Sequence, residues 1–127
     1  MHFKDLPLAP VFLKAIATQG YEKPTPIQQK AMEPALQGRD LVAVAQTGAG
    51  KTAAFALPAL QWLYDTPPPP SQKKKKPIRC LVLSPTRELA SQIEDGFKAY
   101  GKGADFRTQV IFGGVNQNPQ VKQLRRG

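Results

Sequence analysis

The chain has 127 residues and carries 18 basic against 9 acidic side chains, a formal net charge of +9. This length allows at most one domain, and its 41% hydrophobic content is that of an ordinary globular chain. No apolar run approaches the roughly 20 residues of a membrane-spanning helix, and no signal-peptide pattern is present, so we expect a cytoplasmic protein. The excess of positive charge favours a polyanionic partner without proving one.

Turn and cap residues mark the first two helices. A helix is predicted to begin near Pro10, because proline is tolerated in a first helical turn, and Gly20 would end it as a left-handed cap. Thr25 and Pro26 have the types typical of an N-cap and a first helical residue. Gln28, three residues after Thr25, completes a capping box, which by spacing alone gives this glutamine a structural role.

A phosphate-binding loop is predicted at Ala45-Gln46-Thr47-Gly48-Ala49-Gly50-Lys51-Thr52. The apolar run 41–45 before it predicts a strand, and the pattern after it predicts a helix, which is the context that such a loop requires. Its glycines let backbone N–H groups surround a phosphate, Lys51 would reach the β- and γ-phosphates, and the Thr52 hydroxyl would ligate Mg²⁺. The general pattern has glycine where Ala45 stands, so an ordinary strand-to-helix turn is the alternative.

The rest of the chain alternates predicted strands and helices. Residues 67–77 hold a proline run and four lysines, typical of an exposed flexible insertion. The unbroken apolar run 79–84 predicts a strand buried on both faces, with Cys80 as a buried thiol, and 106–112 predicts another. Helices are predicted after Pro85-Thr86-Arg87 and from Asn118. This order indicates an α/β fold with a parallel sheet, whose strand ends would gather the phosphate loop, Pro85 to Arg87 and Gly113-Gly114 at one edge.

Four motifs, in this order and spacing, resemble those of the DEAD-box ATP-dependent RNA helicases, in which alanine at the position of Ala45 is usual. They are the Q motif (Phe3 with Gly20 to Gln28), motif I (Ala45 to Thr52), motif Ia (Pro85 to Ala90) and the GG motif (Phe112 to Gly114). The stretch from Phe112 to Gln120 is similar to the bacterial RhlE-type branch. The resemblance implies a P-loop NTPase fold of the RecA-like kind, with 1–127 as the N-terminal part of the first domain, about three strands present, and 1–29 as the Q-motif region.

The resemblance also implies roles for individual positions, with ATP and Mg²⁺ as cofactors and RNA as partner. Phe3 would stack on adenine and Gln28 would hydrogen-bond its edge, in addition to any capping role. Tyr21, Lys23 and Pro26 would shape the adenine pocket, and Lys51 and Thr52 would be the catalytic residues of motif I. The RNA backbone would pass along Pro85, Thr86, Arg87, Gly113 and Gly114, without reading the base sequence.

The family's later motifs, the Asp-Glu-Ala-Asp motif among them, do not occur in this sequence, and no second RecA-like domain is present. None of the nine acidic residues ends a predicted strand, where a Mg²⁺-holding carboxylate would stand. We therefore expect this chain to bind adenine nucleotide and RNA weakly without turning over ATP, and to self-associate through an open sheet edge. Three alternatives stay open: part of a helicase, a noncatalytic binding fragment, or an unrelated P-loop ATPase in which Gln28 is only a cap.

Overall fold

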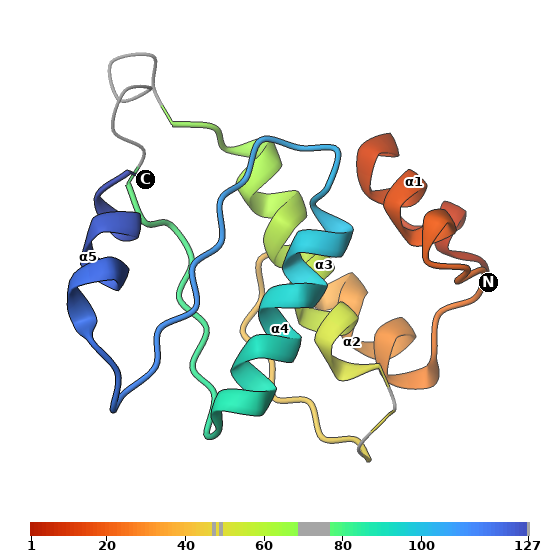
Figure 1. Cartoon of the computed structure of the whole chain (residues 1–127). Coiled ribbons are helices and arrows are strands. Elements are labelled where there is room, and N and C mark those ends of the chain that lie inside the picture. The colour runs from red at the N-terminus through yellow and green to blue at the C-terminus, as the bar shows by residue number, and fades with distance from the viewer. Residues whose placement is uncertain (47, 49, 69–76, 127) are drawn as a thin grey trace.

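The computed structural model describes residues 1–46, 48, 50–68 and 77–126. Within these ranges no helix is long and apolar enough to cross a membrane. Figure 1 shows the helices of the first hundred residues gathered into one body, with the C-terminal helix set apart beyond extended stretches of chain. In chain order the described elements are the 3₁₀ turn η1 (Phe3–Asp5), α1 (Pro10–Thr18), α2 (Pro26–Leu36), α3 (Lys51–Asp65), α4 (Arg87–Tyr100) and α5 (Gln117–Arg125).

The predicted helix boundaries are confirmed where cap residues marked them. Helix α1 begins at Pro10, and Gly20 beyond its end has a φ of 81°, in the left-handed region. Helix α2 begins at Pro26 behind the N-cap Thr25, and Gln28 closes the predicted capping box. These ends follow from local chemistry alone, because each cap satisfies backbone groups within a few residues of itself.

The hydrophobic core lies between α1, α2, α3 and the C-terminal half of α4. Its central ring, Phe12, is fully buried, packs edge-on against Tyr64 at 5.5 Å and stacks with Phe106 at 6.4 Å between ring centroids. Such aromatic pairs add about 0.5–1.5 kcal/mol to the free energy of burial. The largest fully buried side chains are Phe12, Ile16, Met32, Leu57 and Leu60.

The parallel sheet is not confirmed: among the described residues, none of the stretches 41–45, 79–84 and 106–112 forms a strand. Each is irregular chain, and no backbone hydrogen bond between one stretch and another occurs in the described part of the molecule. In Figure 1 the stretches 79–84 and 106–112 lie between the helical body and α5. A parallel sheet is stable when both of its faces are covered, and that covering is missing around these stretches.

Exposure of the apolar side chains shows this lack of cover directly. Val44 is 88% exposed, Leu81 79% and Leu83 85%. The prediction that 79–84 is buried on both faces is therefore wrong for this structure, and Cys80 is exposed rather than buried. The third stretch alternates half-buried and exposed residues from Phe106 to Phe112, so one of its sides rests on the helical body.

Candidate nucleotide and RNA site

The phosphate loop joins the chain at Ala45 to the first turn of α3. Lys51, the first residue of α3, turns its ammonium group back to donate a hydrogen bond to the Ala45 carbonyl at 2.8 Å. Gly48 and Gly50 both have a φ of 84°, in the left-handed region. Thr47 and Ala49 lie outside the described residues, and Gln46 is exposed. Lys51 therefore bonds to the backbone at the start of the loop, and its charge stands at the N-terminus of α3.

Gln28 ties the Q-motif region to this loop. Its side-chain oxygen accepts a hydrogen bond from the Thr25 backbone N–H at 3.0 Å, and its side-chain nitrogen donates to the Gly50 carbonyl at 3.0 Å. The side chain is buried, at 6% exposure. The capping role predicted for Gln28 is thus confirmed, and the same amide also fixes the end of the phosphate loop.

Gly50 has two independent reasons to be glycine. Its positive φ disfavours any side chain, and an added Cβ would stand 2.3 Å from the Gln28 amide nitrogen. Gly48 has the same φ, but nothing lies within 4 Å of its added Cβ. An alanine at Gly48 would therefore meet only the unfavourable φ, whereas an alanine at Gly50 would meet both the unfavourable φ and a steric clash.

Thr52 lies half-buried in the first turn of α3, beside α4. Helix α4 approaches it at Gly96, where an added Cβ would be 3.0 Å from the Thr52 methyl group. The two helices therefore approach closely behind the predicted Mg²⁺ ligand. The spacing of apolar residues along α4 does not single out Gly96, because its importance depends on a contact with a different helix.

The residues predicted around adenine divide into buried and exposed groups. Phe3 is only 5% exposed, belongs to the core, and its backbone N–H donates to the Glu22 carbonyl at 3.1 Å. Tyr21, Lys23 and Pro26 are exposed. Phe3 and Tyr21 share a surface pocket of about 370 Å³ with the end of α1. In this structure the Phe3 ring is packed into protein, so stacking on adenine would require it to turn outward.

The predicted RNA edge is held by Arg87, at the N-terminus of α4. Its guanidinium donates to the Gly113 carbonyl at 2.7 Å and stands 6.0 Å from the centre of the Phe112 ring. Thr86 caps the helix, accepting from the Leu89 N–H at 3.2 Å. Motif Ia and the GG motif thus meet, as predicted from the order of the elements. The other residues predicted at this edge are exposed, namely Pro85, Thr86, Gly113 and Gly114.

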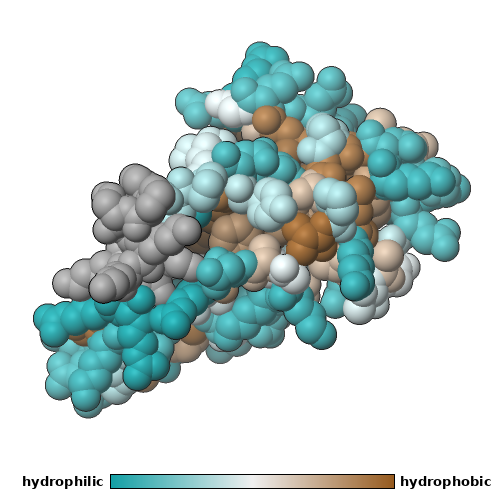
Figure 2. Space-filling view, turned by 90° about the horizontal axis from the view of Figure 1, so that it is seen from above, coloured by the Kyte–Doolittle hydropathy of each residue, from teal (hydrophilic) through white to brown (hydrophobic). Residues whose placement is uncertain are grey.

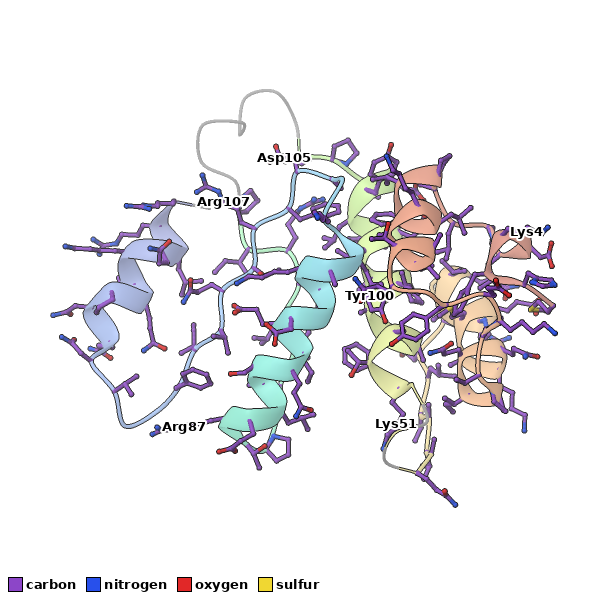
Figure 3. The ribbon with its side chains drawn as sticks, turned by 45° about the vertical axis from the view of Figure 1, so that its right-hand side comes forward. Lys4, Lys51, Arg87, Tyr100, Asp105 and Arg107 are labelled. Atoms are coloured by element: carbon purple, nitrogen blue, oxygen red, sulfur yellow. The ribbon has the colours of Figure 1, made fainter. Side chains whose placement is uncertain are left out.

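Figure 3 places Lys51 and Arg87 at the same end of the molecule, at the first turns of α3 and α4. One residue of each predicted site, Lys51 and Arg87, therefore lies toward the same end, although no strand is formed among the described residues. Farther from this edge, burial raises the pKa of Tyr100, with a smaller contribution from nearby Tyr21.

Gln120 ends the stretch compared with the RhlE-type branch, but the sequence assigned it no role in the site. From α5 its side-chain oxygen accepts from the Phe112 N–H at 2.7 Å, and its nitrogen donates to the Phe112 carbonyl at 3.4 Å. Phe112 is therefore held from one side by Gln120 and approached from the other by Arg87. Gln120 is a polar residue of a short polar helix, and no spacing in the sequence indicates its contact with Phe112.

A glycine-rich loop with a lysine at a helix N-terminus is the arrangement typical of phosphate-loop proteins, and here a buried glutamine is hydrogen-bonded to its end. Comparison with known families narrows this class. The DEAD/DEAH box helicase family matches residues 25–127, and the chain belongs to that family. This membership overturns the alternative of an unrelated P-loop ATPase.

Fungal rRNA helicases are among the curated relatives of the chain. It is 44% identical over 124 residues to the ATP-dependent rRNA helicase RRP3 of Yarrowia lipolytica, covering 98% of this chain and 24% of that protein. It is 49% identical over 122 residues to the ATP-dependent rRNA helicase rrp3 of Sclerotinia sclerotiorum, covering 96% of this chain and 24% of that protein. The chain thus spans about a quarter of the length of these relatives. The bacterial RhlE-type branch receives no support from them.

Solved structures agree with the family. The RNA helicase Prp28 from Chaetomium thermophilum, bound to ADP, superposes with a TM-score of 0.81 and 40% identity, covering 94% of this chain and 28% of that one. A DEAD box protein from Methanococcus jannaschii superposes with a TM-score of 0.81 and 35% identity, covering 99% of this chain and 32% of that one. The chain path is therefore that of the corresponding part of these helicases, although no strand is formed among its described residues.

Proposed function

We propose that this chain is the nucleotide-binding and RNA-contacting part of an ATP-dependent RNA helicase. The observation that carries the proposal is the phosphate loop in which Lys51 and Gln28 meet the same short stretch of backbone. A nucleotide phosphate would replace the Ala45 carbonyl as the partner of Lys51. The loop glycines would supply backbone N–H groups around that phosphate.

Gln28 can serve adenine without giving up its present contacts. Its oxygen has two lone pairs and its nitrogen two hydrogens, and the structure uses one of each. The remaining pair, one acceptor and one donor, matches an adenine edge, which offers an amino group beside a ring nitrogen. A guanine edge presents a carbonyl where adenine has its amino group, so Gln28 would disfavour guanine.

Magnesium would arrive with the nucleotide. Among the described residues no group of three or more His, Cys, Asp or Glu side chains is placed to hold a metal ion. Thr52 offers a hydroxyl in the first turn of α3, beside the lysine that would face the phosphates. One protein hydroxyl together with phosphate oxygens and water is a donor set that suits Mg²⁺. When bound, the ion would neutralise charge between the phosphates.

The RNA backbone would pass along Arg87 and the exposed glycines 113 and 114. Arg87 uses one of its five N–H donors on Gly113 and keeps the others for phosphate. Because these contacts reach phosphate and sugar, they would bind RNA without a preference for sequence. The relatives named above act on RNA by their names, and the ADP of Prp28 supports the nucleotide part of the proposal.

The 127-residue chain on its own should bind these ligands without turning over ATP. Steady-state phosphate release, with and without single-stranded RNA, tests this. No release above background is expected, and release that Lys51→Ala abolishes would show that the chain is an enzyme by itself. Equilibrium binding of Mg²⁺–ADP and of labelled RNA to the same sample tests the binding roles separately.

Self-association is proposed through the uncovered stretches 41–45 and 79–84. Val42, Val44, Leu81 and Leu83 are each more than three-quarters exposed, and exposed apolar side chains in such numbers favour association. Light scattering over a range of concentrations should show a mass that increases with concentration. A constant monomer mass at the highest concentration would refute this part of the proposal.

A further inference from the structure

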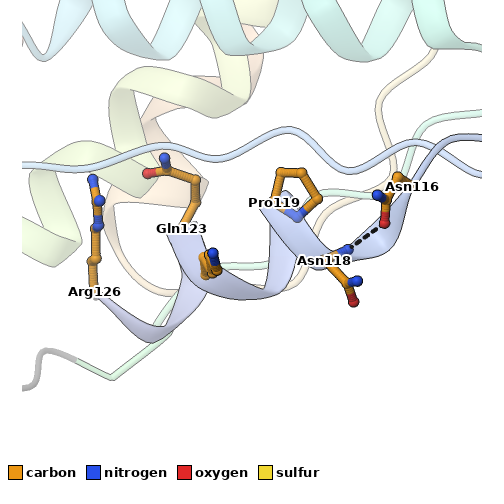
Figure 4. Close-up of a pocket in the computed structure, with 6 residues that line it drawn as sticks. Asn116, Asn118, Pro119, Gln123 and Arg126 are labelled. Carbon is orange, nitrogen blue, oxygen red and sulfur yellow. Dashed lines mark hydrogen bonds between the residues drawn. The ribbon is translucent and has the colours of Figure 1, made fainter.

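A shallow groove runs along α5 and its two cap residues, and no motif of the site includes it (Figure 4). The groove has a volume of about 380 Å³. Its lining is polar and cationic apart from one proline, and consists of Asn116, Asn118, Pro119, Lys122, Gln123 and Arg126. Figure 2 shows this end of the molecule covered almost entirely by hydrophilic side chains, whereas hydrophobic ones gather over the helical body.

The charge around the groove has a single sign. Residues 106–126 contain no Asp or Glu. Lys122 and Arg126 are four positions apart, about 6 Å along a helix axis, so both face the groove. Both are exposed, and no described carboxylate forms an ion pair with either. Two cations without anionic partners, beside amide side chains, make a surface suited to phosphate and sugar oxygens.

The groove has a fixed position relative to the predicted RNA edge. Its first lining residue, Asn116, follows Gly114 by two positions and caps α5 by accepting from the Asn118 N–H at 3.0 Å. Gln120 then fastens α5 to the backbone of Phe112, next to the Gly113 that Arg87 holds. A strand of RNA that leaves Gly113 and Gly114 would therefore meet the groove directly.

We propose that this α5 groove is a second backbone-binding surface for single-stranded RNA, continuing the path from Gly113-Gly114 through phosphate contacts to Lys122 and Arg126. An apolar protein partner is not favoured, because the groove offers one proline and no aromatic or aliphatic pocket. The inference rests on the proposed RNA-binding function and adds a site to it. Arg87 holds the Gly113 end of this path, and α5 would lengthen it by its nine residues, about two and a half helical turns.

The test compares two charge-matched double variants of the 127-residue chain. Lys122→Gln/Arg126→Gln removes the groove cations, and Lys14→Gln/Lys30→Gln removes two exposed lysines from α1 and α2. Binding of a fluorescein-labelled oligouridine is measured by anisotropy between about 50 and 200 mM salt. Circular dichroism melts verify that both variants fold like the unmodified chain.

The groove variant should bind at least about fivefold more weakly at low salt, and its salt slope should fall by about 1.4, since each phosphate contact on a single strand contributes about 0.7. The control should lose less than about twofold and keep its slope. Equal losses in both variants, or no loss in either, would overturn the α5 inference while leaving RNA binding intact. Absence of RNA binding by the unmodified chain would overturn the proposed RNA function as well.

Discussion

The nucleotide side and the RNA side of this molecule are held in place by different forces. Around the phosphate loop, a buried amide and a packed core fix the backbone, with Gln28 at 6% exposure against a core centred on Phe12. At the RNA edge, Phe112 and Gly113 are held by two polar side chains, Arg87 and Gln120. Burial makes the first region resistant to local opening, whereas the second depends on a few hydrogen bonds that water can compete for.

The largest expected effect falls on the nucleotide side. Lys51→Ala should weaken Mg²⁺–ADP binding by about 10- to 100-fold, because a hydrogen bond to a charged group contributes about 1.5–3 kcal/mol. Stability should change little, since the Lys51 side chain is exposed and, among the described residues, bonds to the Ala45 carbonyl alone. Titration calorimetry measures the affinity, and Lys30→Ala is the charge-matched control. Unchanged affinity in Lys51→Ala would mean that the loop does not hold the phosphates.

Gly48 and Gly50 have the same φ but different surroundings, so alanine substitutions at the two positions should differ in their effect on stability. Gly48→Ala should lower the free energy of unfolding by about 1–2 kcal/mol through its positive φ alone. Gly50→Ala should cost about 1–3 kcal/mol more, because its Cβ displaces the buried Gln28 amide from its partners. Urea unfolding measures both variants.

The double variant Gly50→Ala/Gln28→Ala separates packing from backbone strain. Removing the Gln28 side chain removes the clash, so the two substitutions together should cost less than the sum of their separate effects. Strict additivity, or equal stability of Gly48→Ala and Gly50→Ala, would mean that Gln28 does not pack on the loop as the structure describes.

A smaller effect is expected on the RNA side. Gln120→Met keeps the side-chain length but removes both hydrogen bonds to Phe112, at a cost of about 1 kcal/mol. The Phe112 amide should exchange its hydrogen faster by mass spectrometry or NMR, whereas amides in the middle of α3 should be unaffected. Gln123→Met, on the same helix, is the control. Equal exchange at Phe112 in both variants would show that α5 is anchored by something else.

The sequence predicted the helices well because their ends are local features. Thr25 with Gln28, and Gly20 beyond α1, act within a few residues of themselves. The strands were not confirmed, because strand formation depends on partners and cover that lie elsewhere in space. The apolar run around Leu81 and Leu83 has strand character, but the molecule leaves both side chains exposed.

The parts of the site that lie within contiguous sequence motifs could be predicted. The phosphate loop, and the meeting of Arg87 with the GG motif, followed from the order of the elements. The Gln28–Gly50 bond, the Gln120–Phe112 pair and the approach of Gly96 to Thr52 join residues with no fixed spacing. Periodicity cannot reveal them, because each depends on how two elements pack.

The most direct test of the central claim is a thermal melt of the chain with Mg²⁺ and ADP, ATP or GTP, beside Gln28→Ala and the neighbouring control Gln29→Ala. A ligand at about a hundred times its Kd stabilises the fold by about 2.7 kcal/mol, a shift on the order of 10 °C for a chain of this size. We expect this shift with adenine nucleotides only, lost in Gln28→Ala and kept in Gln29→Ala. Equal shifts with GTP, or an undiminished shift in Gln28→Ala, would contradict it.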